Sequence, residues 1–225
     1  VLQKFRLAAQ GKGITRKPPE HLKQRIETYF DPLPFYFDPL EVQATDTHKY
    51  PLAAVTQRPM AMYHSWDSQN AWLRQIHAHN YLFINARTAR LAGIDDGDWI
   101  WVESQWGKVR CMARHSEAVE PGTVWTWNAI GKAAGAWNLT PDANESRLGF
   151  LLNHVISEEL PAGQSRISNS DPVTGQAAWY DVRVRISKVS PGETAETSPQ
   201  FEPLKPYPGQ EERRSLWAYM RGAVK

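Results

Sequence analysis

The chain has few of the features that mark several common classes of protein. Among its 225 residues Cys111 is the one cysteine, which excludes an internal disulfide framework and an iron–sulfur cluster held by cysteines of this chain. Net charge is only +2, from 26 basic and 24 acidic residues, so the broad positive field that attracts nucleic acid is missing. We therefore expect no nucleic-acid partner. In addition, no apolar run approaches the roughly 20 residues of a membrane-spanning helix.

Motifs of common catalytic sites are also missing. There is no Gly-x-Ser-x-Gly elbow, no phosphate-binding loop ending in Gly-Lys-Ser/Thr and no Gly-x-Gly-x-x-Gly fingerprint. His64, His77 and His79 could offer three imidazoles to zinc, but no cysteine or carboxylate at a customary spacing completes such a site. We expect neither a catalytic residue nor a metal ligand in this chain.

The clearest pattern lies between Tyr81 and Val109. Residues 81–84 are apolar and suited to a strand, and Asn85 is a favourable N-cap. Residues 86–92 then predict a helix of two turns, which ends at Gly93 because glycine adopts the left-handed backbone most easily.

A turn at residues 95–98 leads into two predicted strands, 99–104 and 108–115, joined at Gln105-Trp106-Gly107. The second strand alternates between a predicted buried face and a predicted solvated face. The buried face carries Val109, Cys111 and Ala113, and the solvated face carries Lys108, Arg110 and Arg114. The same period of two predicts that Val182, Val184 and Ile186 point inward. These patterns are typical of a β-barrel building block, in which Cys111 is a small buried side chain.

The two ends of the chain differ from its middle. Residues 17–40 combine a predicted helix, 21–30, with proline-interrupted aromatic residues, which suggests a strap on a larger body. Residues 190–208 resemble a linker, and residues 210–220 predict a short helix with Leu216, Trp217 and Met220 on one side. Either these arms dock on a neighbouring domain or subunit, or they fold back on the same domain.

Ten tryptophans allow two interpretations. Aromatic faces can stack on a purine or pterin, and Trp66, Trp72, Trp125 and Trp127 are the candidates for this. Packing in the core or at an interface is the favoured explanation for most of the ten, as for Trp99 and Trp101 within a predicted strand.

The segment 80–107 resembles a pattern of the molybdopterin oxidoreductases, the dimethyl sulfoxide reductase family, in their C-terminal domain. The matching residues are Asn80, Leu82, Ile84, Asn85, Ala89, Gly93, Ile94, Gly97, Asp98, Ile100, Val102, Ser104 and Gly107. Shorter likenesses flank this segment, at Tyr50-Pro51-Leu52, Thr56-Gln57-Arg58, Tyr63-His64-Ser65, Glu120-Pro121-Gly122-Thr123-Val124, Leu152-Asn153-His154 and Asp171-Pro172-Val173-Thr174-Gly175-Gln176. The resemblance covers about residues 48 to 189, and its specificity comes from the order of these weak motifs.

The resemblance implies a mainly β fold, a six-stranded double-psi β-barrel with short helices and extended N- and C-terminal arms. On this basis residues 1–47 form an N-terminal strap, 48–189 the barrel that binds the molybdopterin dinucleotide, and 190–225 a linker with a C-terminal docking segment. Residues 135–151 are longer than the usual connection in the family.

Cofactor-binding residues are implied by position in three loops. The first loop contributes Thr56, Arg58, His64 and Ser65, the second Asn153 and His154, and the third Asp171, Gln176 and Tyr180. A loop with a guanidinium, a hydroxyl and backbone N–H groups suits a pyrophosphate. An Asn amide can donate to and accept from a pterin or guanine edge.

The resemblance further implies part of a catalytic subunit that carries molybdenum or tungsten on a bis(pterin guanine dinucleotide) cofactor. Implied partners are the remainder of the catalytic subunit, an iron–sulfur electron-transfer subunit that holds the cluster and a membrane anchor subunit. The chain would then be a soluble part of a membrane-associated prokaryotic complex, on its cytoplasmic or periplasmic face. The third loop and the residues 151–166 resemble enzymes of sulfur oxyanions or polysulfide. Alternatives are a formate dehydrogenase or nitrate reductase, and a cofactor-free double-psi barrel that serves as an interaction module.

Overall fold

The computed structural model describes residues 1–13, 16–128, 130–131, 138–157, 169–177 and 182–193. Its strands are β1 Leu52–Gln57, β2 Leu82–Ile84, β3 Trp99–Glu103, β4 Lys108–His115, β5 Thr123–Trp127 and β6 Val182–Lys188. Its α-helices are α1 Leu2–Ala9, α2 Lys23–Tyr29, α3 Leu40–Gln43, α4 Ala71–Ile76, α5 Ala86–Leu91 and α6 Asn144–Arg147. Short 3-10 helices are η1 Glu20–Leu22, η2 His64–Trp66 and η4 Leu152–Val155.

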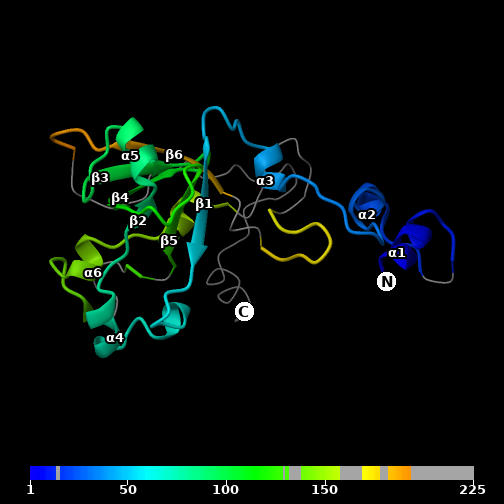
Figure 1. Ribbon diagram of the computed structural model, residues 1–225. Coiled ribbons are helices and arrows are strands. Elements are labelled where there is room, and N and C mark those ends of the chain that lie inside the picture. Colours follow the sequence, from blue (N-terminus) through cyan, green and yellow to red (C-terminus); the bar gives the residue numbers. More distant parts are fainter. Residues whose placement is uncertain (14–15, 129, 132–137, 158–168, 178–181, 194–225) are drawn as a thin grey trace, which may run out of the picture.

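The six strands close into one barrel in the order β1-β5-β2-β4-β3-β6 (Figure 1). Two neighbouring pairs, β1 with β5 and β2 with β4, run parallel, and the other four pairs run antiparallel. Full closure leaves none of these strands with an unpaired edge. The structure confirms the expected mainly β fold with a six-stranded barrel and short helices.

The barrel interior holds the core. Val109, Cys111 and Ala113 of β4 are fully buried, as are Val182 and Val184 of β6. Both inward registers are therefore confirmed, although Ile186, the third predicted inward residue of β6, is only partly buried against the core. Burial also raises the pKa of the Cys111 thiol far above its ordinary value, so the thiol is unreactive, as expected.

The predicted unit from residue 81 to 109 is confirmed in its parts. Asn85 caps α5 by accepting from the N–H of Arg87 at 3.0 Å, and its Nδ2 donates to the carbonyl of Val119 at 2.8 Å. Gly93 follows the helix with a φ of +67°, the left-handed conformation that ends helices. The hairpin β3–β4 pairs Glu103 with Lys108.

Arg110 corrects the expected solvated face of β4. Its side chain is 5% exposed, because the guanidinium lies over the ring of Trp99, 4.4 Å from the ring centroid. Burial lowers the pKa of Arg110. An arginine can stack its planar guanidinium on an aromatic face, so alternation alone did not predict this burial.

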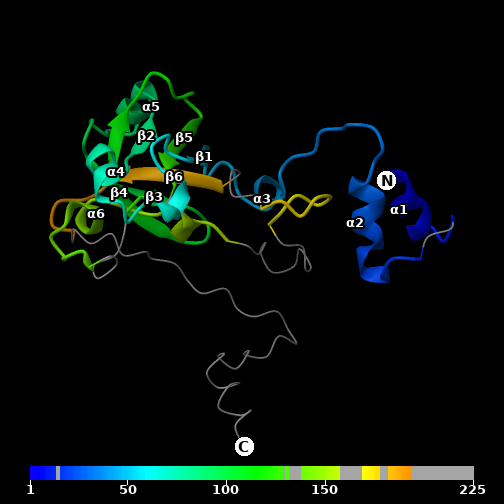
Figure 2. The same cartoon turned by 90° about the horizontal axis from the view of Figure 1, so that it is seen from below.

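The N-terminal helices lie apart from the barrel (Figures 1 and 2). α1 packs against α2 with an edge-to-face contact of Phe5 with Phe30, 5.7 Å between centroids. The helix predicted at 21–30 is present as η1 followed by α2. α3, in contrast, contacts β6 of the barrel. The C-terminal linker and docking segment fall almost entirely on residues 194–225, which lie outside the described residues.

We expect Val184→Asp to prevent stable folding of the barrel, because it places an unpaired carboxylate in the core beside Leu52. The free energy of unfolding should fall by about 3 kcal/mol or more. Denaturant unfolding of the protein that carries this chain measures the change. Ser187→Asp, which places the same charge on the exposed side of the same strand, is the control. Similar stability of the two variants would contradict the assigned register.

Candidate functional site

One end of the barrel has a polar interior. On four strands the inward-facing residues are apolar along most of the strand. At the end of the strand that lies at this end of the barrel, the inward-facing residue is polar. These four residues, Thr56 at the end of β1, Asn80 before β2, Ser104 after β3 and Thr126 in β5, are all buried. Strand pairing places them at the same end. β1 runs parallel to β5 with Thr56 opposite Thr126, and β2 runs antiparallel to β5. β3 points the same way as β1, because both run antiparallel to β6. We call this end the barrel mouth.

The side chain of Asn80 joins the barrel mouth to the segment that follows α6. Its Nδ2 donates to the carbonyl of Phe150 at 2.7 Å, and its Oδ1 accepts from the N–H of Phe150 at 3.0 Å. The same Nδ2 lies 3.3 Å from Thr126 Oγ1 and from the carbonyl of Trp127. Asn80 is completely buried, so these hydrogen bonds satisfy an amide that water cannot reach. They place residue 150 across the mouth.

Ser104 holds the next part of that segment. Its Oγ donates to the carbonyl of Val155 at 2.7 Å and accepts from the N–H of Trp106 at 3.0 Å. Between the contacts of Asn80 and Ser104 lies η4, whose Leu152 and Val155 are buried while Asn153 is exposed. The structure thus presents Asn153 on the outer side of the mouth. Its neighbour His154 is half-buried, and desolvation lowers the pKa of its imidazole.

The first predicted loop begins where β1 ends. Arg58 is exposed, and its guanidinium lies 5.3 Å from the ring centroid of Tyr63. The Tyr63 ring in turn contacts the His64 ring edge-on, 5.4 Å between centroids. His64 is exposed and has a φ of +52°, a backbone conformation uncommon outside glycine. The side chain of Ser65 lies outside the described part of the structure.

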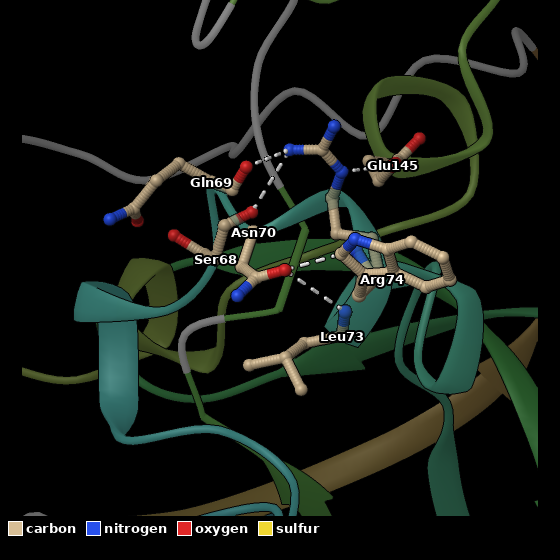
Figure 3. A network of polar contacts seen from close by, with 7 residues as sticks. Ser68, Gln69, Asn70, Leu73, Arg74 and Glu145 are labelled. Carbon is tan, nitrogen blue, oxygen red and sulfur yellow. Dashed lines mark hydrogen bonds and ion pairs between the residues drawn. The ribbon is translucent and has the colours of Figure 1, made fainter.

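A partly buried ion pair connects α4, which follows the first loop, to α6 (Figure 3). Arg74 of α4 pairs with Glu145 of α6 at 3.0 Å, and its Nη1 donates to the carbonyls of Ser68 and Gln69 at 3.3 and 3.0 Å. Asn70 caps α4 by accepting from the N–H groups of residues 72 and 73. The stretch of residues 68–74 and α6, which leads to residue 150, are therefore fixed to each other.

Several buried polar atoms near the mouth have no hydrogen-bond partner among the described residues. They are Thr56 Oγ1, Asn128 Oδ1 and both ring nitrogens of His79. Asn128 follows β5 beside β1, where its N–H donates to the carbonyl of Gln57. Buried polar groups are normally paired, so this end of the barrel suits a polar ligand. Thr56 was among the residues predicted from the sequence. Asn128 was not, because in the sequence it shows only as a polar residue directly after a strand.

The third predicted loop is not at the mouth. It extends toward α2 (Figures 1 and 2), where Arg25 donates to the carbonyls of Asp171 and Pro172 at 3.3 and 2.5 Å. The Asp171 carboxylate is used within its own turn, accepting from the N–H groups of Val173 and Thr174. Gln176 is exposed on the same loop. Tyr180 lies outside the described residues.

The histidine alternative finds no support in the described residues, since none of their His, Cys, Asp and Glu side chains form a group of three that could hold a metal ion. His77 packs on the ring of Trp127, 4.3 Å between centroids. Trp127 in turn meets Phe83, which stacks on Trp125 at 4.0 Å and 8°. Trp125 and Trp127 therefore pack in an aromatic cluster on the outside of the barrel.

Trp66 and Trp72, the other two candidates for stacking, behave differently. They are 74% and 78% exposed, on the stretch between β1 and β2. Their indoles do not belong to the aromatic cluster that contains Trp125 and Trp127.

We expect the free energy of unfolding to fall as the pH drops below about 6.5. Burial is the main cause of a lowered pKa for His77, His79 and His154. These histidines therefore bind protons more readily in the unfolded chain than in the folded one. Their contribution to the free energy of unfolding is fully present above the unfolded-state pKa and declines below it. Melting temperatures between about pH 7.5 and pH 5.5 measure this decline. His79→Gln should make the decline shallower, and an unchanged decline would rule His79 out as a cause.

We expect Asn80→Leu to lower the free energy of unfolding by about 2–4 kcal/mol, because it leaves both backbone groups of Phe150 buried without a partner. Amide hydrogen exchange at Phe150 should quicken more than exchange within β4. Gln75→Leu removes an amide from the exposed side of α4 and is the control. Slow exchange at Phe150 in the Asn80 variant would contradict the role of this side chain.

Comparison with known proteins identifies the family of the barrel. Residues 52–159 match the molydopterin dinucleotide binding domain. The chain is 69% identical over 99% of its length to a sulfite dehydrogenase subunit from Allochromatium vinosum, of which it covers 23%. It is 28% identical over 83% of its length to dopamine dehydroxylase of Eggerthella lenta, of which it covers 16%.

Among solved structures, acetylene hydratase from Pelobacter acetylenicus shares the fold. The TM-score is 0.53 at 23% identity, over 71% of this chain and 22% of that one. The chain thus spans less than a quarter of the length of each of these three relatives. On the family match and the identity of 69%, the chain belongs to the molybdopterin oxidoreductases, and its residues 52–159 match their molydopterin dinucleotide binding domain.

Proposed function

We propose that this chain is the cofactor-binding part of a catalytic subunit that oxidises or reduces a sulfur oxyanion, with a bis(pterin guanine dinucleotide) cofactor of molybdenum or tungsten. The observation that carries this proposal is the barrel mouth, where the buried Thr56 Oγ1 lacks a partner among the described residues. Arg58 and Asn153 stand on the two segments that border the mouth. When bound, the cofactor supplies the two-electron chemistry, while the chain supplies binding and orientation.

The residues at the mouth fit the parts of a dinucleotide. The exposed guanidinium of Arg58 offers charge-assisted and bidentate hydrogen bonds to phosphate oxygens. The Thr56 hydroxyl offers a neutral donor or acceptor beside it, and His64 and Ser65 continue the same loop. The exposed amide of Asn153 can both donate to and accept from a guanine or pterin edge. His154, whose lowered pKa favours the neutral ring, adds one donor and one acceptor without a charge.

Rigid supports make this set suitable for orientation. Asn80 and Ser104 fix the segment that carries Asn153. Arg74 ties residues 68 and 69, further along the stretch that begins at Arg58, to α6. A ligand between two fixed segments loses less of its binding energy to ordering the protein. Asp171 and Gln176 lie on a loop directed elsewhere, so we assign them no contact with the part of the cofactor at the mouth.

The substrate class is supported by the identity of 69% to the sulfite dehydrogenase subunit. Electrons exchanged with such a substrate need a path out of the active site, and one cysteine cannot hold an iron–sulfur cluster. We therefore propose an iron–sulfur protein as electron-transfer partner. None of the described helices is long and apolar enough to cross a membrane. A membrane anchor subunit is part of the proposal as a further partner.

Asn153→Leu should lower cofactor occupancy while the barrel still folds. Leucine keeps most of the volume but removes both donor and acceptor, at a cost of roughly 1–3 kcal/mol for a buried ligand edge left unpaired. This corresponds to roughly 5- to 150-fold weaker binding of the cofactor. Metal and pterin content per polypeptide, measured on the complete enzyme after gel filtration, report the loss.

Two further variants sharpen the experiment. Arg58→Met should weaken cofactor binding as well, and the wild type should show a stronger dependence on ionic strength than this variant. Gln176→Leu makes the same kind of change as Asn153→Leu, on the loop directed away from the mouth, and should leave occupancy unchanged. Full cofactor content and full activity in the Asn153 variant would contradict the proposal.

A further inference from the structure

Glu41 is a fully buried carboxylate on α3, outside the barrel. Its two oxygens accept hydrogen bonds from three side chains that are far away in the sequence. Oε1 accepts from Trp106 Nε1 at 3.0 Å and from Gln105 Nε2 at 3.2 Å, and Oε2 accepts from Asn169 Nδ2 at 2.9 Å. A carboxylate is the one side-chain group that offers two acceptor oxygens and no donor to such a set.

One path leads from Glu41 through the β3–β4 hairpin to the segment over the barrel mouth. Trp106, whose indole binds Glu41, donates its backbone N–H to Ser104 Oγ at 3.0 Å. Ser104 Oγ in turn donates to the carbonyl of Val155 at 2.7 Å. Glu41 therefore fixes Trp106, and Trp106 is hydrogen-bonded to Ser104, which holds the end of η4.

A second path reaches the same segment from its other side. Asn169 Nδ2, which binds Glu41, also lies 3.2 Å from the carbonyl of Ser157. The carbonyls of Val155 and Ser157 are two residues apart, and both depend on groups that Glu41 orients. Asn153 stands only two residues before the first of them. The geometry connects the carboxylate to the backbone that carries this amide.

We propose that Glu41 is a positioning residue for the cofactor, which acts by holding the segment of Asn153 in place over the barrel mouth. This inference rests on the proposed function of Asn153. Thr45 strengthens the arrangement, because its Oγ1 donates to the backbone carbonyl of Glu41 at 2.7 Å and accepts from Gln105 Nε2 at 2.7 Å. α3 itself contacts β6, so the helix that carries this carboxylate also lies against the barrel.

Glu41→Gln tests the proposal with the smallest change of shape. An amide keeps one acceptor oxygen but turns an NH2 group toward neighbours that are themselves donors. In the complete enzyme we expect cofactor to dissociate about tenfold faster than in the wild type, with the barrel folded. Glu117→Gln makes the same chemical change at an exposed position after β4 and should not alter the rate.

A cycle of variants separates positioning from general stability. Ser104→Ala removes one path, so if Glu41 acts through it, the double variant should lose cofactor measurably more slowly than the sum of the two single effects predicts. Additive effects of the two changes would contradict the first path. Should Glu41→Gln fail to fold, Ser104→Ala and Asn169→Ala must each speed cofactor loss in folded enzyme, and wild-type rates in both would overturn the proposal.

The result also distinguishes this inference from the function on which it rests. Fast cofactor loss in Asn153→Leu with wild-type behaviour of folded Glu41→Gln would overturn the positioning role alone. Wild-type cofactor retention in both variants would overturn the assigned role of Asn153 and this inference with it. Fast loss in both, with Glu117→Gln unaffected, is the expected outcome.

Discussion

The buried amide of Asn80 is the contact on which the arrangement of the barrel mouth depends. It binds both backbone groups of Phe150 from inside the barrel, which is a paired interaction that only an amide side chain can make. Without it, residue 150 would keep the packing of its ring in the core, but it would lose the hydrogen bonds that fix its backbone at the end of β5, where η4 begins. The exposed position of Asn153 over the mouth follows from this contact, together with the hydrogen bond of Ser104 to Val155.

The fold was largely predictable because its signals are local. Alternation gave the inward faces of β4 and β6, and Asn85 and Gly93 marked the two ends of α5, all as the structure has them. Alternation failed where a charged side chain is buried by a specific contact. Arg110 is buried because its guanidinium stacks on Trp99, a contact between two strands that neither strand shows alone.

The candidate site was predictable in part, at residues near the end of β1 and, through the family resemblance, at Asn153. Thr56 and Arg58 lie at the end of β1, so the topology of the barrel brings them to the mouth. Glu41 gave no such signal, because its partners Gln105, Trp106 and Asn169 lie 64, 65 and 128 residues further along the chain. Such long-range pairs cannot be derived from one sequence. The position of the third loop depends likewise on Arg25, which is 146 and 147 residues away from its two acceptors.

The change from apolar to polar at the last inward position explains how one barrel serves both stability and binding. The apolar layers beneath, such as Val124 below Thr126, hold the strands together and exclude water. Thr56, Asn80, Ser104 and Thr126 then form a layer of hydrogen-bonding groups that only a structured segment or a ligand can satisfy. Asn80 and Ser104 bind the protein's own backbone, and Thr56 Oγ1 stays without a described partner. Some groups of this layer thus close the end of the barrel, while others face the position where a dinucleotide would lie. A substitution that repacks one of these residues is therefore expected to change both the stability of the barrel and the binding of the cofactor.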